Sequence, residues 1–517
     1  MALVAAVAFG PLGALLAAAA ARTARDPSVL LWAVPGERLG LLVRSVAFSA
    51  AVALVTVAVG VLAATVLWRR RGGRLAAWRW AVLAMVAVPA YVHALAWSRA
   101  AFALRSVLEP LGLPAPPSTG LALAAWVQGM TLLPLATGLG LLALEAVPDE
   151  LVDAGRVLQP DGRVLWLLVL PLAGPALAAA AALLFVLSLL DYSVPALFQV
   201  NAYALAVFAQ YSATYDATRA LLVALPMCGA AAVAVLVALH GARRAAQRLG
   251  RRNAPGVPRL HASPALRVAQ GLALALVVAQ AAVPLVILSR AVGSPRALGP
   301  MVAAARDEIA MTLAVAALAA GVAVPLAVVA ANGLSRRGTT GAVWWMLVAA
   351  PLALPASLVG IGLIQLWIRP GLPGVYGSAA MPVLAAAARF VPYAALAVAA
   401  QARRVDPLLI DAARVHRTSW RAAWLRVRLP LLAPGLIAAA CLTFVLTVGE
   451  LGATVVVAAP GRQTLTLLIY NYLHYGASDA VAGLCLVLAV AALAVMAVGL
   501  LALSAWSRLG RRRVAPA

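Results

Sequence analysis

The sequence predicts an all-α integral membrane protein with about twelve transmembrane helices in two parallel six-helix repeats. Hydrophobic residues make up 65% of the 517 residues, mean hydropathy is +0.99, and charged residues make up only 11%. A bilayer span needs about 20 mostly apolar residues, and the chain offers such runs repeatedly. Two long segments, one in each half, also resemble each other. This composition excludes a soluble globular domain.

Six apolar runs fill the first half of the chain, near residues 2–21, 45–68, 80–98, 119–143, 168–198 and 220–240. The first run could pass for a signal peptide. It lacks a basic n-region, however, and more spans follow, so we interpret it as a transmembrane helix.

Six further runs fill the second half, near residues 268–289, 309–332, 342–368, 378–400, 429–458 and 480–504. Between the halves lies an Arg-rich segment with Gly and Pro that is too polar to cross lipid and reads as a cytoplasmic linker. The predicted division is a first half at 1–241, a linker at 242–267 and a second half at 268–517. Prolines within runs, such as Pro89, Pro351 and Pro355, are expected to shape kinks.

The net charge of +24 comes with 40 basic residues, all of them arginine. Such a charge invites a nucleic-acid interpretation, but the arginines cluster in short loops between apolar runs. Most lie in alternate loops, the linker and the C-terminal tail, which is the distribution of the positive-inside rule. We therefore expect no nucleic-acid partner, and we expect both termini and the linker to face the cytoplasm.

The two halves repeat at the level of individual residues. The stretch from Arg163, RVLWLLVLPLAGPALAAAAALLFVLSLLDYSVPALF, parallels RAAWLRVRLPLLAPGLIAAACLTFVLTVGELGATVVV from Arg421. At one constant offset, the residues Pro171, Pro175 and Asp191 correspond to Pro430, Pro434 and Glu450. Repeats of this kind place a transport pathway at the interface between the halves.

A half-apolar loop precedes each copy of this stretch, between the fourth and fifth runs of its half, and the second of these loops is rich in arginine. The second loop offers a helix start, because Asp406 can cap a helix whose first residue is Pro407. In the first loop, Pro160-Asp161-Gly162 predicts a turn. A short helix below the bilayer suits docking into a groove on a partner. The alternative is an interfacial helix held only by positive-inside charge.

These loops resemble the EAA loop of type I ABC importer permeases, in which a short coupling helix inserts into a cytoplasmic ATPase. The acidic-Ala-Ala core and the Leu-Pro end are matched in the second copy, and the first copy matches with one residue fewer. Both copies lack the family glycine, because Gln159 and Arg417 stand there. The resemblance implies these coupling residues: Asp153, Ala154, Gly155, Arg156, Leu170, Pro171, Asp411, Ala412, Ala413, Arg414, Leu429 and Pro430.

The two-half layout resembles the iron(III)/thiamine-type permease group, in which one polypeptide supplies both membrane halves. The phrases GELGATVVVAAPGRQTLTLLIYNYLHYG and LLDYSVPALFQVNAYALAVFAQYSATYD are most similar to the iron(III) branch. The resemblance implies the type I ABC importer permease fold, a location in the bacterial cytoplasmic (inner) membrane, and iron(III) as the substrate. Thiamine or another small solute is the alternative.

A phosphate-binding P-loop needs a lysine, and this chain has none. We therefore expect no enzyme activity, no catalytic residue, no metal site and no bound cofactor. ATP and magnesium would act on a separate ABC ATPase, which we expect to be a homodimer. The family resemblance adds an extracytoplasmic substrate-binding protein as the second partner.

Three charges inside apolar runs are candidates for a pathway or gate. Asp191 and Glu450 occupy equivalent places in the two halves, and Arg389 is the most isolated basic residue within a run. Intramembrane charges are costly and usually face a cavity or the bundle interior. The structural alternatives are a carboxylate that caps a bend and an ion pair between Arg389 and Glu450.

A secondary transporter with twelve helices in parallel repeats is the main alternative function. Its basic central loop would look similar, but the paired EAA-like loops favour the ABC importer. A membrane-embedded enzyme is disfavoured, because the acidic residues are few and no His or Cys cluster accompanies them.

Overall fold

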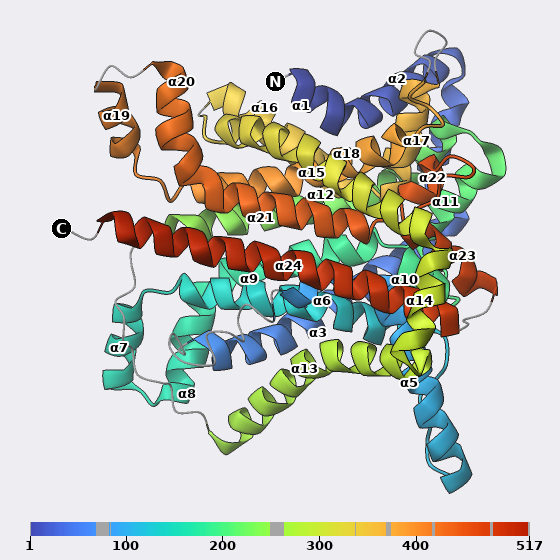
Figure 1. Cartoon of the computed structure of the whole chain (residues 1–517), viewed down its shortest axis with the longest axis horizontal. Coiled ribbons are helices and arrows are strands. Elements are labelled where there is room, and N and C mark those ends of the chain that lie inside the picture. The colour runs from blue at the N-terminus through green and yellow to red at the C-terminus, as the bar shows by residue number, and fades with distance from the viewer. Residues whose placement is uncertain are drawn as a thin grey trace.

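The computed structural model describes residues 2–68, 82, 84–248, 263–336, 338–368, 374–415, 419–475 and 479–514. All regular elements in these ranges are helical, and the long helices form one bundle (Figure 1). Cys228, Cys441 and Cys485 lie within these helices as free thiols.

The first half contains the following elements in chain order: α1 (Ala2–Val4), η1 (Ala5–Phe9), α2 (Gly10–Arg25), η2 (Pro27–Ala33), η3 (Gly36–Arg38), α3 (Leu39–Trp68), η4 (Met85–Ala87), α5 (Ala90–Leu108), η5 (Glu109–Leu111), α6 (Leu121–Glu145), α7 (Asp149–Leu158), α8 (Asp161–Val164), η6 (Leu165–Val169), α9 (Leu170–Leu189), α10 (Ser193–Leu197), α11 (Tyr203–Thr214) and α12 (Ala217–Arg248).

The second half contains α13 (Pro264–Val292), α14 (Pro295–Ala304), α15 (Arg306–Leu334), α16 (Gly338–Ala349), η7 (Ala350–Ala353), α17 (Ala356–Trp367), α18 (Ala380–Ala402), α19 (Pro407–Val415), α20 (Trp420–Ala423), η8 (Trp424–Arg428), α21 (Leu429–Val448), α22 (Thr454–Val457), α23 (Leu465–Tyr475) and α24 (Asp479–Val514). Residues 249–262 of the predicted linker lie outside the described residues, and α12 and α13 extend into its two ends.

Within the described residues, ten helices are long and apolar enough to span a membrane, or eleven if one bent pair is counted as a span. These spans match eleven of the twelve predicted runs, with the bent pair counted as one span. Pro355 ends the run at 342–368 midway, and its two helices meet at 111°. In the run at 80–98, residues 80, 81 and 83 lie outside the described residues, and α5 begins only after Pro89. Both prolines act as the expected breaks, because a proline disfavours helical geometry in the residue before it.

The elements around the two loops follow the same order in both halves. The series α7, α8, η6, α9, α10 is matched by α19, α20, η8, α21, α22. Even the π-helical turns repeat: η6 and η8 each end just before a Leu-Pro pair. Proline has no N–H to continue the α-helical hydrogen-bond ladder. In both copies the preceding leucine donates its N–H to the carbonyl five residues back, on Leu165 and Trp424.

The first long helix of each half packs against the other half. Helix α2 contacts α17, while α13 contacts α3, α5 and α6. The α2–α17 contact is close because Gly362 has no side chain: a Cβ there would lie 2.3 Å from the backbone oxygen of Pro11. The two halves are thus interlocked rather than merely adjacent.

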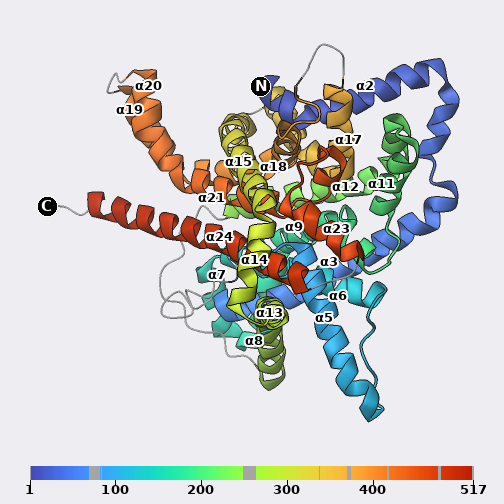
Figure 2. The same cartoon turned by 45° about the vertical axis from the view of Figure 1, so that its right-hand side comes forward.

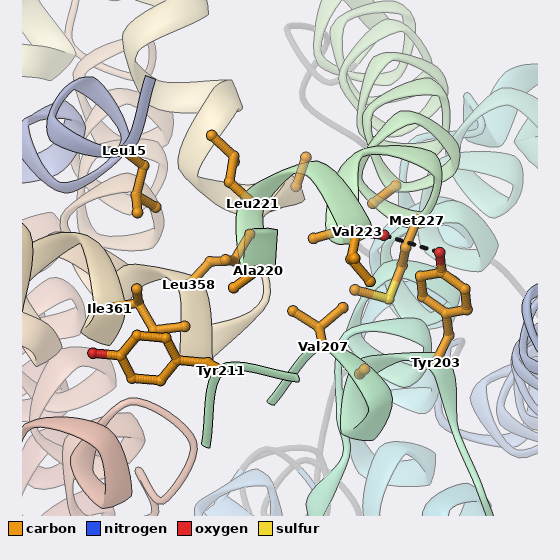
Figure 3. Packing of buried hydrophobic residues seen from close by; sticks show 14 of the residues in the cluster. Leu15, Tyr203, Val207, Tyr211, Ala220, Leu221, Val223, Met227, Leu358 and Ile361 are labelled. Atoms are coloured by element: carbon orange, nitrogen blue, oxygen red, sulfur yellow. Dashed lines mark hydrogen bonds between the residues drawn. The ribbon is translucent and has the colours of Figure 1, made fainter. Parts of the chain in front are cut away.

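The core near α11 and α12 shows how this interlocking is filled. Figure 3 shows Val207, Tyr203 and Met227 packed between these two helices, with Leu358 and Ile361 of α17 nearby. The Tyr203 hydroxyl donates a hydrogen bond to the carbonyl of Val223, 2.9 Å away. Residues from both halves therefore share one apolar cluster.

The loop helices lie together at one end of the bundle, which we call the loop end. Helices α7 and α8 lie on one side of the C-terminal part of α24, and α19 and α20 lie on the other (Figures 1 and 2). Elements α10, α11, α22 and α23 lie toward the opposite end (Figure 1).

Candidate functional site

Helix α7 is amphipathic and presents one face outward. It begins after Pro148, has Asp149 and Glu150 in its first turn, and ends at Gln159 before Pro160. Acidic residues in a first turn complement the positive end of the helix dipole. Val152 is fully buried, whereas Asp153 and Ala154 are exposed. Asp153 and Ala154, two of the residues predicted for coupling, thus lie on the outward face, whereas Gly155 and Arg156 are half-buried.

Helix α19 in the second half has the predicted start. The Asp406 carboxylate accepts the N–H of Leu408 at 2.9 Å, and Pro407 is the first helical residue. Asp411 and Ala412 are exposed. The prediction of a turn at Pro160-Asp161-Gly162 in the first loop is wrong in part. The break falls at Gln159 and Pro160, and Asp161 and Gly162 already belong to α8.

Exposed apolar side chains recur at equivalent positions of the two loops. Val157 is 85% exposed and Val415, its counterpart, is 79% exposed. Leu151 and Leu409 form a second exposed pair, and Trp166 and Leu425 form a third. Exposed apolar side chains at matching positions of both loops favour an interaction site. The surface formed by these three pairs, which we call the paired docking surface, is therefore built twice at the loop end.

The first loop is fixed to itself more tightly than the sequence resemblance implies. The Arg156 guanidinium pairs with Asp161 at 2.8 Å, tying α7 to α8, while Asp153 lies 4.0 Å from Arg156. Gly155 allows close packing, because a Cβ there would lie 2.9 Å from the Leu168 side chain.

The second loop is fixed by a different contact. The sequence has Trp420 where the first copy has Asp161. Arg428, just before the Leu-Pro pair, donates a hydrogen bond to the Asn332 side chain at 2.5 Å and so fixes η8 to α15. The side chains of Ala413 and Arg414, and residues 416–418, lie outside what the structure describes.

A small cavity lies between the halves, away from the loops. Its volume is about 180 Å³, and its walls come from α5, the ends of α9 and α21, η7 and α18. Asp191, Arg389 and Glu450 all line it. The three charges singled out in the sequence are thus brought together. The cavity is smaller than the ~300–1,000 Å³ typical of small-molecule pockets, so it has the dimensions of a constriction.

Asp191 is held by neutral partners. One carboxylate oxygen accepts the Ser193 N–H at 2.9 Å and its hydroxyl at 2.6 Å, and the other accepts the Gln128 amide at 3.2 Å. Gln128 in turn accepts a hydrogen bond from Ser188 at 3.0 Å. The carboxylate therefore caps the bend between α9 and α10 while also facing the cavity.

Glu450 is held by a cation. One of its oxygens accepts the N–H of Ala453 at 2.7 Å, which caps the bend before α22, and the other pairs with the Arg389 guanidinium. The Glu450 side chain is 5% exposed and that of Arg389 is 26% exposed. Both structural alternatives raised from the sequence, a cap and an ion pair, are confirmed.

Other residues at this site carried no signal in the sequence. Gln128 lies in an apolar run where a single amide is unremarkable, yet it is 3% exposed and bonds Asp191. Tyr192 crosses the interface, and its hydroxyl donates to the carbonyl of Gly452 at 3.4 Å. Tyr393 lies one turn beyond Arg389 and also lines the cavity. The repeat and the charges within apolar runs pointed to the region, but not to these three residues.

Comparison with known proteins supplies a family. Residues 323–515 match the family described as binding-protein-dependent transport system inner membrane component. The molybdenum transport system permease protein of Mycobacterium tuberculosis is 32% identical over 236 residues, which cover 42% of this chain and 88% of that protein.

Two further relatives carry other substrate names. The putrescine transport system permease protein of Escherichia coli is 26% identical over 213 residues, covering 40% of this chain and 73% of that protein. The putative 2-aminoethylphosphonate transport system permease protein of Salmonella paratyphi A is 29% identical over 177 residues, covering 34% and 65%. Each match takes up less than half of this chain.

Proposed function

Because this chain belongs to the family of binding-protein-dependent transport system inner membrane components, we propose that it supplies both membrane halves of one ABC importer. The family and the relatives make it a permease subunit. The proposal adds that the halves act as a pair within one polypeptide. It is supported by the repeated order of elements and by a relative that aligns over 88% of its own length with 42% of this chain.

The observation that carries the proposal is the paired docking surface. Exposed apolar side chains at equivalent positions of α7 and α19, both at the loop end, suit a partner with two equivalent grooves. We propose that this partner is a homodimeric cytoplasmic ABC ATPase that binds ATP and magnesium. Asp153, Ala154, Asp411 and Ala412 would contact it directly.

Coupling would follow ordinary linkage. ATP binding changes the separation of the two ATPase grooves, and each state of the partner favours one arrangement of the loops. The Arg156–Asp161 pair makes the helices of the first loop move as one unit, and the Arg428–Asn332 hydrogen bond makes the second loop move with α15. We propose that this motion opens and closes the cavity lined by Asp191, Arg389 and Glu450, with both termini on the ATPase side.

For the substrate, we propose iron(III), delivered by an extracytoplasmic binding protein. This proposal rests on the resemblance of the segments around Asp191 and Glu450 to the iron(III) branch. The relatives carry the names of molybdenum, putrescine and 2-aminoethylphosphonate. Thiamine, molybdate, putrescine and the phosphonate are therefore the solutes to test beside iron(III).

The deciding experiment is purification of the intact chain from its native membrane in mild detergent, followed by mass spectrometry of bound proteins. We expect a P-loop ATPase at two copies per chain. Ala154→Glu combined with Ala412→Glu should remove it, because a charge would be buried in each docking groove. Ser335→Glu, an exposed change on the turn after α15, serves as the control and should leave binding intact.

Transport assays separate the importer from an ion-gradient carrier. Uptake into vesicles that contain the chain, its ATPase and the binding protein should require internal ATP and persist when ion gradients are dissipated. Uptake that follows the gradient and ignores ATP would favour the secondary transporter and overturn the proposal.

A further inference from the structure

A second, much larger cavity runs along the side of the first half. Its volume is about 1480 Å³, and its walls are α3, α6 and α11, with the end of α9 and the loop before α11. We call it the lateral groove. It exceeds the ~300–1,000 Å³ of typical small-solute pockets, and it is long because it follows one stripe of α3 from Leu41 to Val59.

The groove opens sideways from membrane-spanning helices. Its lining includes side chains that remain exposed, such as Ala51 and Val55 on α3 and Trp126 on α6. Since α3 and α6 are both long and apolar enough to span the bilayer, lipid can reach exposed side chains on them. Trp126 packs edge-on against Trp97 at 5.4 Å, so one rim of the groove is rigid.

The wall formed by α11 is fixed from behind. Its buried face, with Tyr203 and Val207, packs on α12 (Figure 3). The Tyr203 N–H also bonds the Ser45 hydroxyl on α3 at 2.9 Å. The side of α11 that lines the groove contributes Leu205, Ala206 and Ala209. The groove is therefore a stable feature of the packing.

The lining changes character along its length. Near the start of α3 it contains Arg44, which is exposed and whose Nε donates to the Gly40 carbonyl at 3.2 Å. Toward the middle of the bundle it contains Val59, Leu133 and Leu276. Asp191 also reaches the groove, but its oxygens are already held by Ser193 and Gln128. A cation at one end and apolar walls beyond it match an amphiphile with an anionic head.

The second half has the opposite charge at the equivalent position. When the buried positions of α3 and α15 are matched, Arg44 corresponds to Asp307 and Ser45 to Glu308. Carboxylates would repel an anionic head group, so the cation marks the first half alone. The repeat thus supplies an internal comparison for the role of Arg44.

We propose that the lateral groove binds an anionic phospholipid of the surrounding bilayer, with the phosphate at Arg44 and an acyl chain along α3, α6 and α11. Arginine recognises phosphate through charge-assisted, bidentate hydrogen bonds. The acyl chain would fill apolar walls that open toward lipid. This site shares Asp191 with the inter-half cavity, and the proposal does not depend on the transported solute.

The test uses the full chain in bilayer discs of equal parts phosphatidylglycerol and phosphatidylcholine. After transfer to detergent, the lipids that stay bound are counted by native mass spectrometry. We expect one retained phosphatidylglycerol per chain. Arg44→Gln should lower its retention about tenfold, the effect of losing one charge-assisted contact, and Asp307→Asn should leave it unchanged.

A second variant tests lipid binding in the groove without changing a charge. Ala209→Trp places a large side chain on an exposed part of the lining and should reduce retention of both lipids, with thermal unfolding in detergent as the check on folding. Retention of phosphatidylglycerol by Arg44→Gln and Ala209→Trp at the original level would overturn the proposal. So would displacement of the lipid by glycerol phosphate alone, because that result would remove the acyl chain from recognition.

Discussion

Each half of the chain caps the bend after its equivalent helix with a carboxylate, but the two carboxylates have different partners. Asp191 and Glu450 stand at the same place after equivalent helices, and both accept a backbone N–H that caps the following bend. In the first half the remaining partner is the neutral amide of Gln128, and in the second half it is the cation Arg389. Both carboxylates thus cap a backbone N–H, whereas the side chain that holds the second oxygen differs between the halves.

The difference has a consequence for the inter-half cavity. Its two carboxylates are not electrostatically equivalent, because one pairs with an arginine and the other is held by neutral hydrogen-bond donors. Removing one partner of a buried ion pair costs more than removing a neutral donor, because an unpaired charge remains. The halves can therefore be told apart by mutation.

The largest effect is expected at the loops. Ala154→Glu alone and Ala412→Glu alone should each lower uptake about 100-fold, since an unpaired charge in an interface costs about 3 kcal/mol. Uptake per chain in reconstituted vesicles measures this. If one variant transports normally while the other does not, the two copies of the docking surface are not equivalent.

The next effect concerns the two carboxylates. Arg389→Leu should lower the free energy of unfolding by about 2–4 kcal/mol, at the lower end because the arginine is partly exposed. Gln128→Leu should cost only about 1 kcal/mol, because Ser193 still bonds Asp191. Thermal unfolding in detergent compares them.

A double variant controls this comparison. Arg389→Leu with Glu450→Gln should recover most of the lost stability, since glutamine keeps the acceptor for the Ala453 N–H without a charge. No recovery would mean that Arg389 stabilises the fold through its other contacts, such as the Phe390 ring.

The last helix of each half offers a third comparison. A Cβ on Gly241 of α12 would lie 2.2 Å from the backbone oxygen of Pro175, whereas one on Gly499 of α24 would lie 2.4 Å from the Cys441 sulfur. Backbone cannot yield, but a thiol can rotate. Gly241→Ala should therefore cost about 2 kcal/mol, and Gly499→Ala under about 1 kcal/mol. Equal midpoints of thermal unfolding would contradict this reasoning.

The smallest effect is expected from the tie within the first loop. Asp161→Ala removes the ion pair with Arg156, in which both side chains are largely shielded from solvent. Loss of this pair should lower the stability of the folded loop by about 1 kcal/mol. ATPase binding should weaken about fivefold. Ser335→Glu, which lies outside the docking surface, is the control in a binding titration, and a similar loss there would show that the tie is unimportant.

The repeat and the two loops could be predicted from the sequence, because short local motifs identify both. The Asp-Ala core, the Leu-Pro end and the charge alternation are local patterns, and they predicted two equivalent loop helices. The cap at Asp406 was likewise readable from two adjacent residues. Hydropathy did not reveal the bent pair, because an apolar run such as 342–368 looks the same whether it crosses lipid or turns back after Pro355.

Other features depend on packing between distant segments and left no local signal. Gln128 became visible only once the fold brought it to Asp191. The lateral groove is lined by alanine and valine that hydropathy counts as ordinary span residues. The small residues of α2 and α13 do not indicate whether these helices pack within their own half or against the other half.

The exchange of first helices between halves also bears on how the protein is made. Helix α2 emerges from the ribosome early, but its packing partner α17 follows only after most of the chain. At about 5–20 residues per second, that delay is roughly twenty seconds to over a minute. Until then the face around Pro11 has only lipid or insertion factors as neighbours. The first half therefore cannot complete its native structure alone, and quality control in the cell must tolerate a half-built intermediate.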